Sequence, residues 1–326
     1  MDVAIGAVAQ ALAQAARLAT AAPSIFNMQP WRLTVEPPVL TLAADVERRL
    51  RVDPLGRLLT VSCGAALHHA RVALAASGFA AVVERLPDPR RPELLARLHA
   101  TLPHRPTPDE IMIAAAATIR RTDRRAYGDE PVPPDVLHRL GMAARAQGAE
   151  LHIVRADQMP LFSVIALRAA DVENADVGYR AELTRWVNRP PWSGDGVPRE
   201  TAVRPGPRRV PVRDFTLDPG GGMPIGPGTD RGAAYAVLFG RDDEPAAWLR
   251  AGEALSAVLL TATVEGLSSA PISDVVEVGT TRALVRGLLP VDAHPYIALR
   301  VGLEVGGDTV PRSPRRAASE AIDIRQ

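Results

Sequence analysis

The spacing of apolar residues divides the chain into long helical segments and short strands. Over residues 4–22 apolar side chains recur every three or four positions, which predicts an amphipathic helix ended by Pro23. The same spacing predicts helices over residues 58–79, 111–121, 134–147 and 246–265, and further helices up to residue 185. Strands are expected over residues 31–35, 39–43, 150–155, 235–239 and 296–301. A Pro- and Arg-rich stretch, 86–92, is expected to precede another helical segment and a linker at 103–108.

A faint internal repeat relates the two halves of the chain. Residues 64–79 and 252–267 align at a constant offset of 188, with both glycines, an alanine and a leucine in common. Each copy is expected to be a helix that ends at glycine. Upstream, the helix-then-strand order of residues 12–31 returns over residues 136–151. The chain therefore resembles two copies of one unit, although so few matches also arise by chance.

Residues 188–230 differ sharply from the rest of the chain. Prolines and glycines recur throughout, and three successive glycines occupy 220–222. A structureless loop of about forty residues is usually a functional lid or disordered. The glycine run is not a phosphate loop, since neither a Gly-Lys-Ser/Thr sequence nor a strand-to-helix context accompanies it. We interpret the segment as a lid.

Composition excludes several kinds of chemistry. The 38 basic and 37 acidic residues leave a net charge of +1, which argues against a dedicated nucleic-acid binder. Every one of the 38 is arginine, so Schiff-base and lysine general-base chemistry are excluded. The single cysteine, Cys63, excludes an intramolecular disulfide and any multi-cysteine metal site.

No targeting or membrane signal is evident in the sequence. The first residues lack a basic segment, and Gln10, Gln14 and Arg17 interrupt their apolar stretch. The longest clean apolar run, 111–119, is far shorter than the roughly 20 residues that a spanning helix needs. The protein is therefore expected to be soluble and cytoplasmic, with no membrane partner.

Three short motifs carry candidate chemistry. Residues 22–31 read Ala-Pro-Ser-Ile-Phe-Asn-Met-Gln-Pro-Trp and lie between a helix and a strand, where polar side chains can offer directional hydrogen bonds; the alternative is an ordinary helix-ending turn. Residues 120–127 read Arg-Arg-Thr-Asp-Arg-Arg-Ala-Tyr, which suits a phosphate; the alternative is a solvated helix end. Residues 266–274 read Gly-Leu-Ser-Ser-Ala-Pro-Ile-Ser-Asp, and their small side chains let a flat ligand approach the backbone.

Other residues with reactive side chains are interpreted as structural. His68, His69 and His138 have no partners at metal-ligand spacing, and a helical histidine without partners is usually structural. Cys63 is expected to be a small buried residue rather than a nucleophile.

Together these motifs resemble the flavin-dependent nitroreductases. Residues 23–31 are similar to the family's Pro-Ser-x-x-Asn-x-Gln-Pro-Trp signature, and residues 120–124 to its Arg-Arg-Ser-x-Arg phosphate motif, with Thr122 in place of serine. Residues 266–273 resemble the Gly-Leu-Gly-x-x-Pro-Ile loop, and residues 311–316 the basic C-terminal segment. The motifs span nearly the whole chain. The Asn-x-Gln-Pro-Trp element is fairly specific, and the others are persuasive in combination.

The order of the motifs differs from that of an ordinary nitroreductase. There, the arginine motif opens the chain and the asparagine segment follows, and two identical subunits share each FMN. Here the asparagine segment lies in the first half and the arginine motif opens the second. The resemblance therefore implies a fused pseudo-dimer, similar to the actinobacterial Acg-type nitroreductase-like proteins. Residues 1–109 would form an N-terminal half-nitroreductase unit, and residues 110–326 a C-terminal unit that carries the lid-like loop at about 188–230.

The resemblance also implies a set of FMN-binding residues. The phosphate and ribityl end would be held by Arg120, Arg121, Thr122, Arg124 and Arg315, with Arg312 beside it. The flavin ring would be lined by Pro23, Ser24, Ile25, Asn27, Pro271, Ile272 and Ser273, with a backbone N–H near Ser273 facing N5. Gln29 belongs to the same segment and is expected to brace it. Asp274 stands where the family has glycine, and a carboxylate near N5 disfavours reduction.

The interpretation is an α+β fold, a mixed sheet flanked by helices, in which internal duplication mimics the family homodimer around one FMN. The expected activity is reduction of a small electrophile by NAD(P)H through the flavin, which supplies the chemistry without a catalytic side chain or a metal. Two alternatives remain open, a flavin-sequestering protein with FMN buried under the loop and a flavin-free binding scaffold. The fused halves are expected to be monomeric, with further dimerisation left open.

Overall fold

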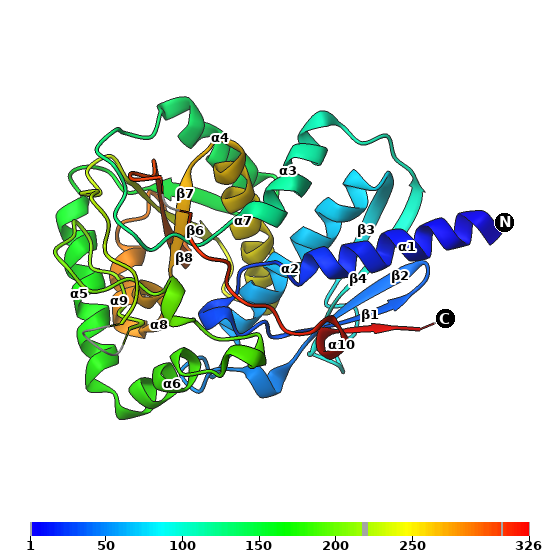
Figure 1. Cartoon of the computed structure of the whole chain (residues 1–326), viewed down its shortest axis with the longest axis horizontal. Coiled ribbons are helices and arrows are strands. Elements are labelled where there is room, and N and C mark those ends of the chain that lie inside the picture. The colour runs from blue at the N-terminus through cyan, green and yellow to red at the C-terminus, as the bar shows by residue number, and fades with distance from the viewer. Residues whose placement is uncertain (1, 217–220, 308, 326) are drawn as a thin grey trace.

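A five-stranded sheet forms the N-terminal part of the computed structural model, which describes residues 2–216, 221–307 and 309–325. Its strands follow the order β3-β4-β2-β1-β9, and neighbours are antiparallel except β9, which runs parallel to β1. Figure 1 shows the C-terminal segment, in red, crossing from the other part of the molecule to reach β1. The strands are β1 (Trp31–Glu36), β2 (Val39–Ala44), β3 (Phe79–Arg85), β4 (Leu94–Pro103) and β9 (Ile322–Ile324).

A second, wholly antiparallel sheet forms the C-terminal part. Its order is β5-β6-β8-β7, and its strands are β5 (Glu150–Ile153), β6 (Ala234–Gly240), β7 (Ser268–Ile272) and β8 (His294–Gly302). Read from its other edge, the second sheet runs β7-β8-β6-β5. These strands take the places of β3, β4, β2 and β1 in the first sheet. The architecture is α+β as expected, with two sheets in place of the predicted single one.

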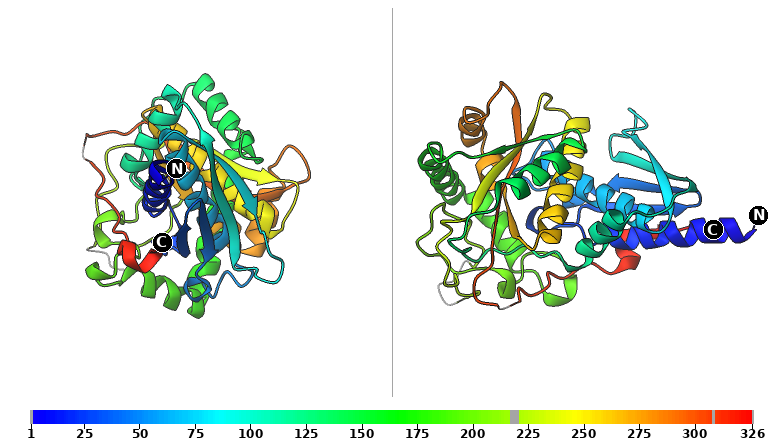
Figure 2. Two further views of the ribbon diagram at one scale, coloured as in Figure 1. Left: turned by 90° about the vertical axis from the view of Figure 1, so that its right-hand side faces the viewer. Right: turned by 90° about the horizontal axis from the view of Figure 1, so that it is seen from above.

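The helices repeat the same correspondence. α1 (Asp2–Ala19) precedes β1, and α2 (Arg57–Ala76) connects β2 to β3; α4 (Pro134–Arg145) precedes β5, and α7 (Pro245–Val264) connects β6 to β7. The long helices α2 and α7 pack against each other between the two sheets, where Figures 1 and 2 show them at the centre of the molecule. By length and composition α2 could cross a membrane, and 83% of that stretch is buried in the structure.

Helices α2 and α7 cross at two glycines from corresponding positions of the repeat. A Cβ atom placed on Gly64 would lie 2.1 Å from the carbonyl oxygen of Leu249, and one on Gly252 would lie 2.0 Å from that of Val61. The contact is reciprocal, because Leu249 and Val61 differ by the same offset of 188 residues as the two glycines. Reciprocal contact between equivalent residues is the mark of an interface with two-fold symmetry.

A hydrogen-bonded group lies one turn further along the same two helices. The Nδ1 atom of His68 lies 2.8 Å from Oγ of Ser256, which is again 188 residues away. The same hydroxyl lies 2.9 Å from Nδ1 of His69. Burial lowers the pKa of His69 to about 3, and the nearby charges of Arg120 and Arg315 add to the effect. Both histidines are therefore neutral structural residues, as expected.

The glycine crossing gives a stability prediction. Gly64→Ala should lower the free energy of unfolding by at least about 1–3 kcal/mol, because its methyl group meets backbone atoms that cannot rotate away. Gly141→Ala in α4 is the matched control, since a Cβ atom placed on Gly141 would meet nothing within 4 Å; it should be neutral or stabilise by up to about 1 kcal/mol. Urea denaturation of both variants measures the difference. Equal stability of the two variants would contradict the close helix crossing.

Several elements differ from the sequence prediction. The expected helix after residues 86–92 is strand β4, because its Leu- and Ala-rich sequence is paired on both sides, with β2 and β3. β3, β7, β9 and the short helices α8 (Asp274–Glu277), α9 (Gly279–Arg286) and α10 (Ala318–Ala321) were not predicted. The expected helices elsewhere are present as α3 (Pro108–Ile119), α5 (Met159–Ala175) and α6 (Val177–Val187).

The loop 188–230 has little regular structure in its described part. It contains two short 3-10 turns, η3 (Pro191–Ser193) and η4 (Arg199–Thr201), and a single bridge between Val203 and Met223. Residues 217–220, which include the first glycine of the run, lie outside the described residues. The loop is nonetheless held by the buried side chains of Arg208 and Arg213, each of which pairs with a carboxylate.

Candidate functional site

A cavity lies where the two halves of the chain meet. The cavity and its open mouth together enclose about 1050 Å³. The lining comes from both halves and from the long loop: residues 23–27, Leu58, Val61, Ser62, Arg120, Thr122, Arg124, Val212, Arg213, Phe215, Leu255, residues 270–274, Ile297, Arg300, Ser313 and Arg315.

The N-terminal side of the cavity is a tight, strained turn that includes the 3-10 helix η1 (Ile25–Asn27). Phe26, Asn27 and Gln29 have φ angles of 48°, 54° and 53°, in the left-handed region that non-glycine residues seldom adopt. The Ser24 hydroxyl accepts from the backbone N–H of Gln29 at 2.9 Å, and that of Ser62 accepts from the N–H of Ile25 at 3.1 Å. Strain of this kind is typical of functional sites.

Asn27 joins this turn to the C-terminal tail and to the long loop. Its Oδ1 accepts from Nη1 of Arg315 at 3.0 Å, and its Nδ2 donates to the carbonyl oxygen of Gly196 at 3.0 Å. Arg315 also donates to the carbonyl oxygen of Ala21 at 2.8 Å. These contacts fix the tail guanidinium at the cavity, beside the first half of the chain.

Three guanidiniums, one buried and two half-buried, lie close together in the lining of the cavity. We call Arg120, Arg124 and Arg315 the arginine cluster. Within the described part of the chain none of the three forms an ion pair with a carboxylate. Burial lowers the pKa of Arg120 to about 9, with repulsion from Arg315 as the next cause; burial also lowers that of Arg124 and of Arg315 to about 10. The cluster is therefore uncompensated positive charge directed at a cavity.

Two atoms of the arginine cluster also lack hydrogen-bond partners. The Nε atoms of Arg120 and Arg315 are buried and, among the described residues, have no acceptor. Arg120 contacts Thr122 through Nη1 at 3.3 Å. The Nε of Arg300 is also unpartnered, but Asp230 neutralises that guanidinium; at the arginine cluster the unpartnered donors lie on guanidiniums without a carboxylate, and an acceptor in the cavity would satisfy them. An anion with several oxygens, such as a phosphate, would supply it.

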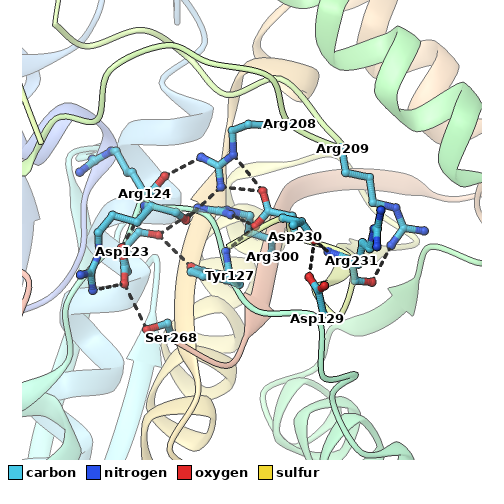
Figure 3. Close-up of polar contacts among 12 residues, drawn as sticks. Asp123, Arg124, Tyr127, Asp129, Arg208, Arg209, Asp230, Arg231, Ser268 and Arg300 are labelled. Atoms are coloured by element: carbon cyan, nitrogen blue, oxygen red, sulfur yellow. Dashed lines mark hydrogen bonds and ion pairs between the residues drawn. The ribbon is translucent and has the colours of Figure 1, made fainter. Parts of the chain in front are cut away.

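The other two arginines of the lining are neutralised by carboxylates. Arg300, fully buried in β8, donates to Oδ1 of Asp230 at 2.6 Å and stacks 4.0 Å from the ring centroid of Tyr127. Oδ2 of Asp230 accepts from Arg208 of the long loop at 2.7 Å. Figure 3 shows this network, in which Arg208 also reaches the carbonyl oxygen of Arg124 at 2.6 Å. The network holds the loop to the phosphate motif.

The loop has a second buried anchor in Arg213. Its guanidinium donates to Glu173 and to Glu277, both at 2.7 Å, and to the hydroxyl of Ser273 at 3.3 Å. It also lies 5.1 Å from the ring centroid of Phe26, which belongs to the N-terminal turn. The loop residues 212, 213 and 215 thus form part of the cavity wall.

Residues 271–273 lie at the end of strand β7 and directly after it. Thr122 forms a parallel bridge with Ser269, and the backbone N–H of Asp123 donates to Ser269 O at 3.0 Å. This pairing brings residues 120–124 close to Pro271, Ile272 and Ser273, all of which line the cavity.

The structure brings most of the predicted site residues together. Of the fourteen, eleven line the cavity: Pro23, Ser24, Ile25, Asn27, Arg120, Thr122, Arg124, Pro271, Ile272, Ser273 and Arg315. Gln29 lies behind the turn, fully buried, and donates to Gly194 O at 2.7 Å, so it braces the segment. Arg121 donates to the carbonyl oxygen of Ile119 at 2.7 Å, and Arg312 is exposed; both lie outside the lining.

Two lining arginines were not predicted. Arg300 had a sequence signal, because an arginine inside an otherwise apolar strand must find a buried partner. Arg213 had none, since it lies in a loop without periodicity. Cys63 is buried and donates to Pro30 O at 3.1 Å, and burial raises the pKa of its thiol. Among the described residues, no group of three or more potential metal ligands is found.

Comparison with known proteins gives long matches to two relatives from Mycobacterium tuberculosis. The chain is 39% identical over 322 residues to the protein named "Putative NAD(P)H nitroreductase Rv3131", covering 94% of this chain and 89% of the relative. It is 34% identical over 322 residues to "Putative NAD(P)H nitroreductase acg", covering 95% of each. No family model matches the sequence.

Solved structures give more distant matches. The FMN-dependent nitroreductase NfnB from Mycobacterium smegmatis, in complex with NADPH, has 17% sequence identity and a TM-score of 0.41, covering 66% of this chain and 100% of that one.

Proposed function

This chain belongs to the nitroreductase family, and on that premise we propose that its cavity binds one FMN and passes electrons from NAD(P)H to a small electrophile. The observation that carries the proposal is the arginine cluster: among the described residues, its three cations have no carboxylate partner, and two of them have a buried Nε atom without an acceptor. A phosphate monoester carries about −1.5 to −2 charge near neutral pH and offers three strong acceptor oxygens. It would satisfy the unpartnered donors and relieve the repulsion between the guanidiniums.

The rest of the lining fits the remainder of FMN. Apolar side chains, Leu58, Val61, Leu255 and Ile297, provide walls for a flat ring, as in most small-molecule sites. Residues 23–27 and 270–274 approach from opposite halves of the chain. Thr122 adds a hydroxyl beside Arg120. Bound FMN would accept and release electrons, while these residues bind it, orient it and tune its potential.

We further propose that the chain is an internally duplicated pseudo-dimer. Support comes from the matching strand order of the two sheets and from the reciprocal contact of Gly64 and Gly252. The tail gives additional support, since β9 completes the sheet of the other half. One chain would then do what two subunits do in an ordinary member of the family. The first half would contribute the turn at residues 23–27 to this FMN site, and the second half would contribute the arginines of residues 120–124.

One observation favours a second candidate, a protein that sequesters flavin and turns over little. The long loop lines the cavity and is anchored by two buried ion pairs, of Arg208 with Asp230 and of Arg213 with Glu173. A loop held over the ring would prevent a nicotinamide from stacking on it. A loop that opens would instead admit NAD(P)H and the electrophile.

The visible spectrum of the purified protein, recorded without oxygen, separates these candidates. The proposed reductase shows a flavin spectrum that bleaches when NADPH or NADH is added. A spectrum that only dithionite bleaches identifies the sequestering protein. A colourless protein that stays so with added FMN contradicts both and leaves the flavin-free scaffold.

A further inference from the structure

Three buried carboxylates surround one buried guanidinium at the cavity wall. We call Glu173, Asp274 and Glu277 the acid cluster. Arg213 is paired with Glu173 and Glu277, and Asp274 is close enough for all three charges to affect one another. Each of these four side chains is more than nine-tenths buried. Fully ionised, the cluster would carry three negative charges against one positive charge. Burial disfavours that state, so the cluster retains a proton.

Asp274 is the least compensated member of the acid cluster. Both oxygens of Glu173 accept from Arg213, at 2.7 and 3.2 Å, and Glu277 accepts from Arg213 and from the hydroxyl of Tyr179. Asp274 has no such donor within the described residues; its Oδ1 accepts from the backbone N–H of Val275 at 2.9 Å. Asp274 is 97% buried and lines the cavity next to Ser273.

We propose that Asp274 is the proton donor of the cavity, which gives its proton to the acceptor as the acceptor is reduced. This inference rests on the proposed function, which supplies the hydride from a reduced flavin. A two-electron acceptor such as a quinone gains one hydride and one proton. The O–H bond of the Asp274 carboxyl group breaks, a new O–H bond forms on the acceptor, and the carboxylate left behind regains a proton from solvent.

The surroundings determine the pH range in which the donor is available. Burial raises the pKa of Asp274 to about 6, with Glu277 adding to the rise and Arg213 opposing it. Burial likewise raises the pKa of Glu173 to about 7. The other charged or titratable groups around this cluster are Arg124, Tyr179 and Asp53. Because the acid form donates, the donor is present below about pH 6 and is lost as pH rises. Reduction of bound FMN would add negative charge to the ring, which would raise the pKa of Asp274 and keep it protonated to a higher pH.

Potentiometric titration of the FMN-loaded protein tests the inference without relying on turnover. In the wild type, reduction should take up one additional proton per two electrons just above pH 6, because the charge of the reduced ring raises the pKa of Asp274. Asp274→Asn keeps the acceptor for the Val275 N–H and should lose this additional proton. Asp274→Glu should restore it. Asp157→Asn, at an exposed position, is the matched control and should behave as the wild type.

Single-turnover oxidation of the dithionite-reduced protein by 1,4-benzoquinone gives the second readout. The wild-type rate should fall as pH rises through and above 6. Asp274→Asn should react about a hundredfold more slowly, the usual effect of losing a general acid, and without that pH dependence. Unchanged proton uptake and an unchanged rate in this variant would overturn the inference.

The outcomes also separate this inference from the proposed function. A wild-type protein that holds no FMN overturns the proposed function, and the flavin absorbance shows this before any titration. A wild-type protein that holds FMN but takes up no additional proton overturns only the role of Asp274. If Asp274→Asn does not retain FMN, the variant Glu173→Gln replaces it in the test. Removing the repelling Glu173 carboxylate lowers the pKa of Asp274, so the additional proton uptake must move to lower pH. Proton uptake at an unchanged pH would contradict the inference.

Discussion

Replacing Arg120 and Arg124 together by methionine is expected to weaken FMN binding by roughly two to four powers of ten. Each substitution removes a charge-assisted contact worth about 1.5–3 kcal/mol, and about 1.4 kcal/mol corresponds to a factor of ten. Methionine keeps much of the buried volume, so the effect comes from charge rather than from a cavity. Equilibrium titration monitored by flavin fluorescence measures the affinity. Affinity within threefold of the wild type would contradict the phosphate assignment.

Two single variants locate this effect. Arg121→Met is the matched control within the motif, because Arg121 faces carbonyl oxygens outside the cavity lining, and it should lose far less affinity. Arg120→Met should leave the FMN-free protein at least as stable as the wild type, since burial and repulsion already disfavour the Arg120 charge. A loss of both affinity and stability in Arg120→Met would mean that the guanidinium serves the fold.

Asp230→Asn is expected to lower the free energy of unfolding by about 3–5 kcal/mol, the usual cost of breaking a buried ion pair from one side. Asp230 is fully buried and accepts from Arg300, from Arg208 and from the backbone N–H of Tyr127. The substitution leaves two buried guanidiniums without a counter-charge. Asp230 has a φ of 60°, which asparagine also tolerates, so backbone strain does not contribute to the loss of stability.

Urea denaturation measures this change, with Asp157→Asn as the control. Asp157 also pairs with an arginine, Arg155, but its side chain is 70% exposed, and exposed pairs contribute little. The Asp230 variant should in addition release the long loop, because Arg208 loses its partner, and proteolysis should then cut within residues 188–230. A loss of less than about 1 kcal/mol would show that Asp230 is not the anchor of the loop.

The sequence was informative where chemistry and periodicity are local. The offset of 188 residues between the two glycine helices was visible in the sequence, and the structure places those glycines in contact. The residues within each motif lie side by side at the cavity because each motif is a continuous segment of chain. Strand β4 could not be predicted, because its leucines and alanines favour a helix and only pairing with two neighbouring strands overrides that preference.

The electrostatic partners in the site could not be predicted, because they come from distant parts of the chain. Arg300 meets Asp230 across 70 residues of sequence, and Arg213 meets Glu277 across 64. Nothing local distinguishes Arg213, which is buried among carboxylates, from the exposed Arg312. For the same reason, the sequence does not reveal that Arg300 has a carboxylate partner whereas Arg120 has none among the described residues, a difference that underlies the proposed phosphate site.

We propose that one chain forms one FMN site from both of its halves. The most direct measurement is calorimetric titration of flavin-free protein with FMN, together with the mass of the complex in solution. We expect one FMN per chain on a single-chain species, with binding weakened by Asn27→Ala in the first half as well as by Arg120→Met in the second. Two FMN per chain, one FMN per two chains, or an Asn27→Ala variant that binds as the wild type does would contradict it.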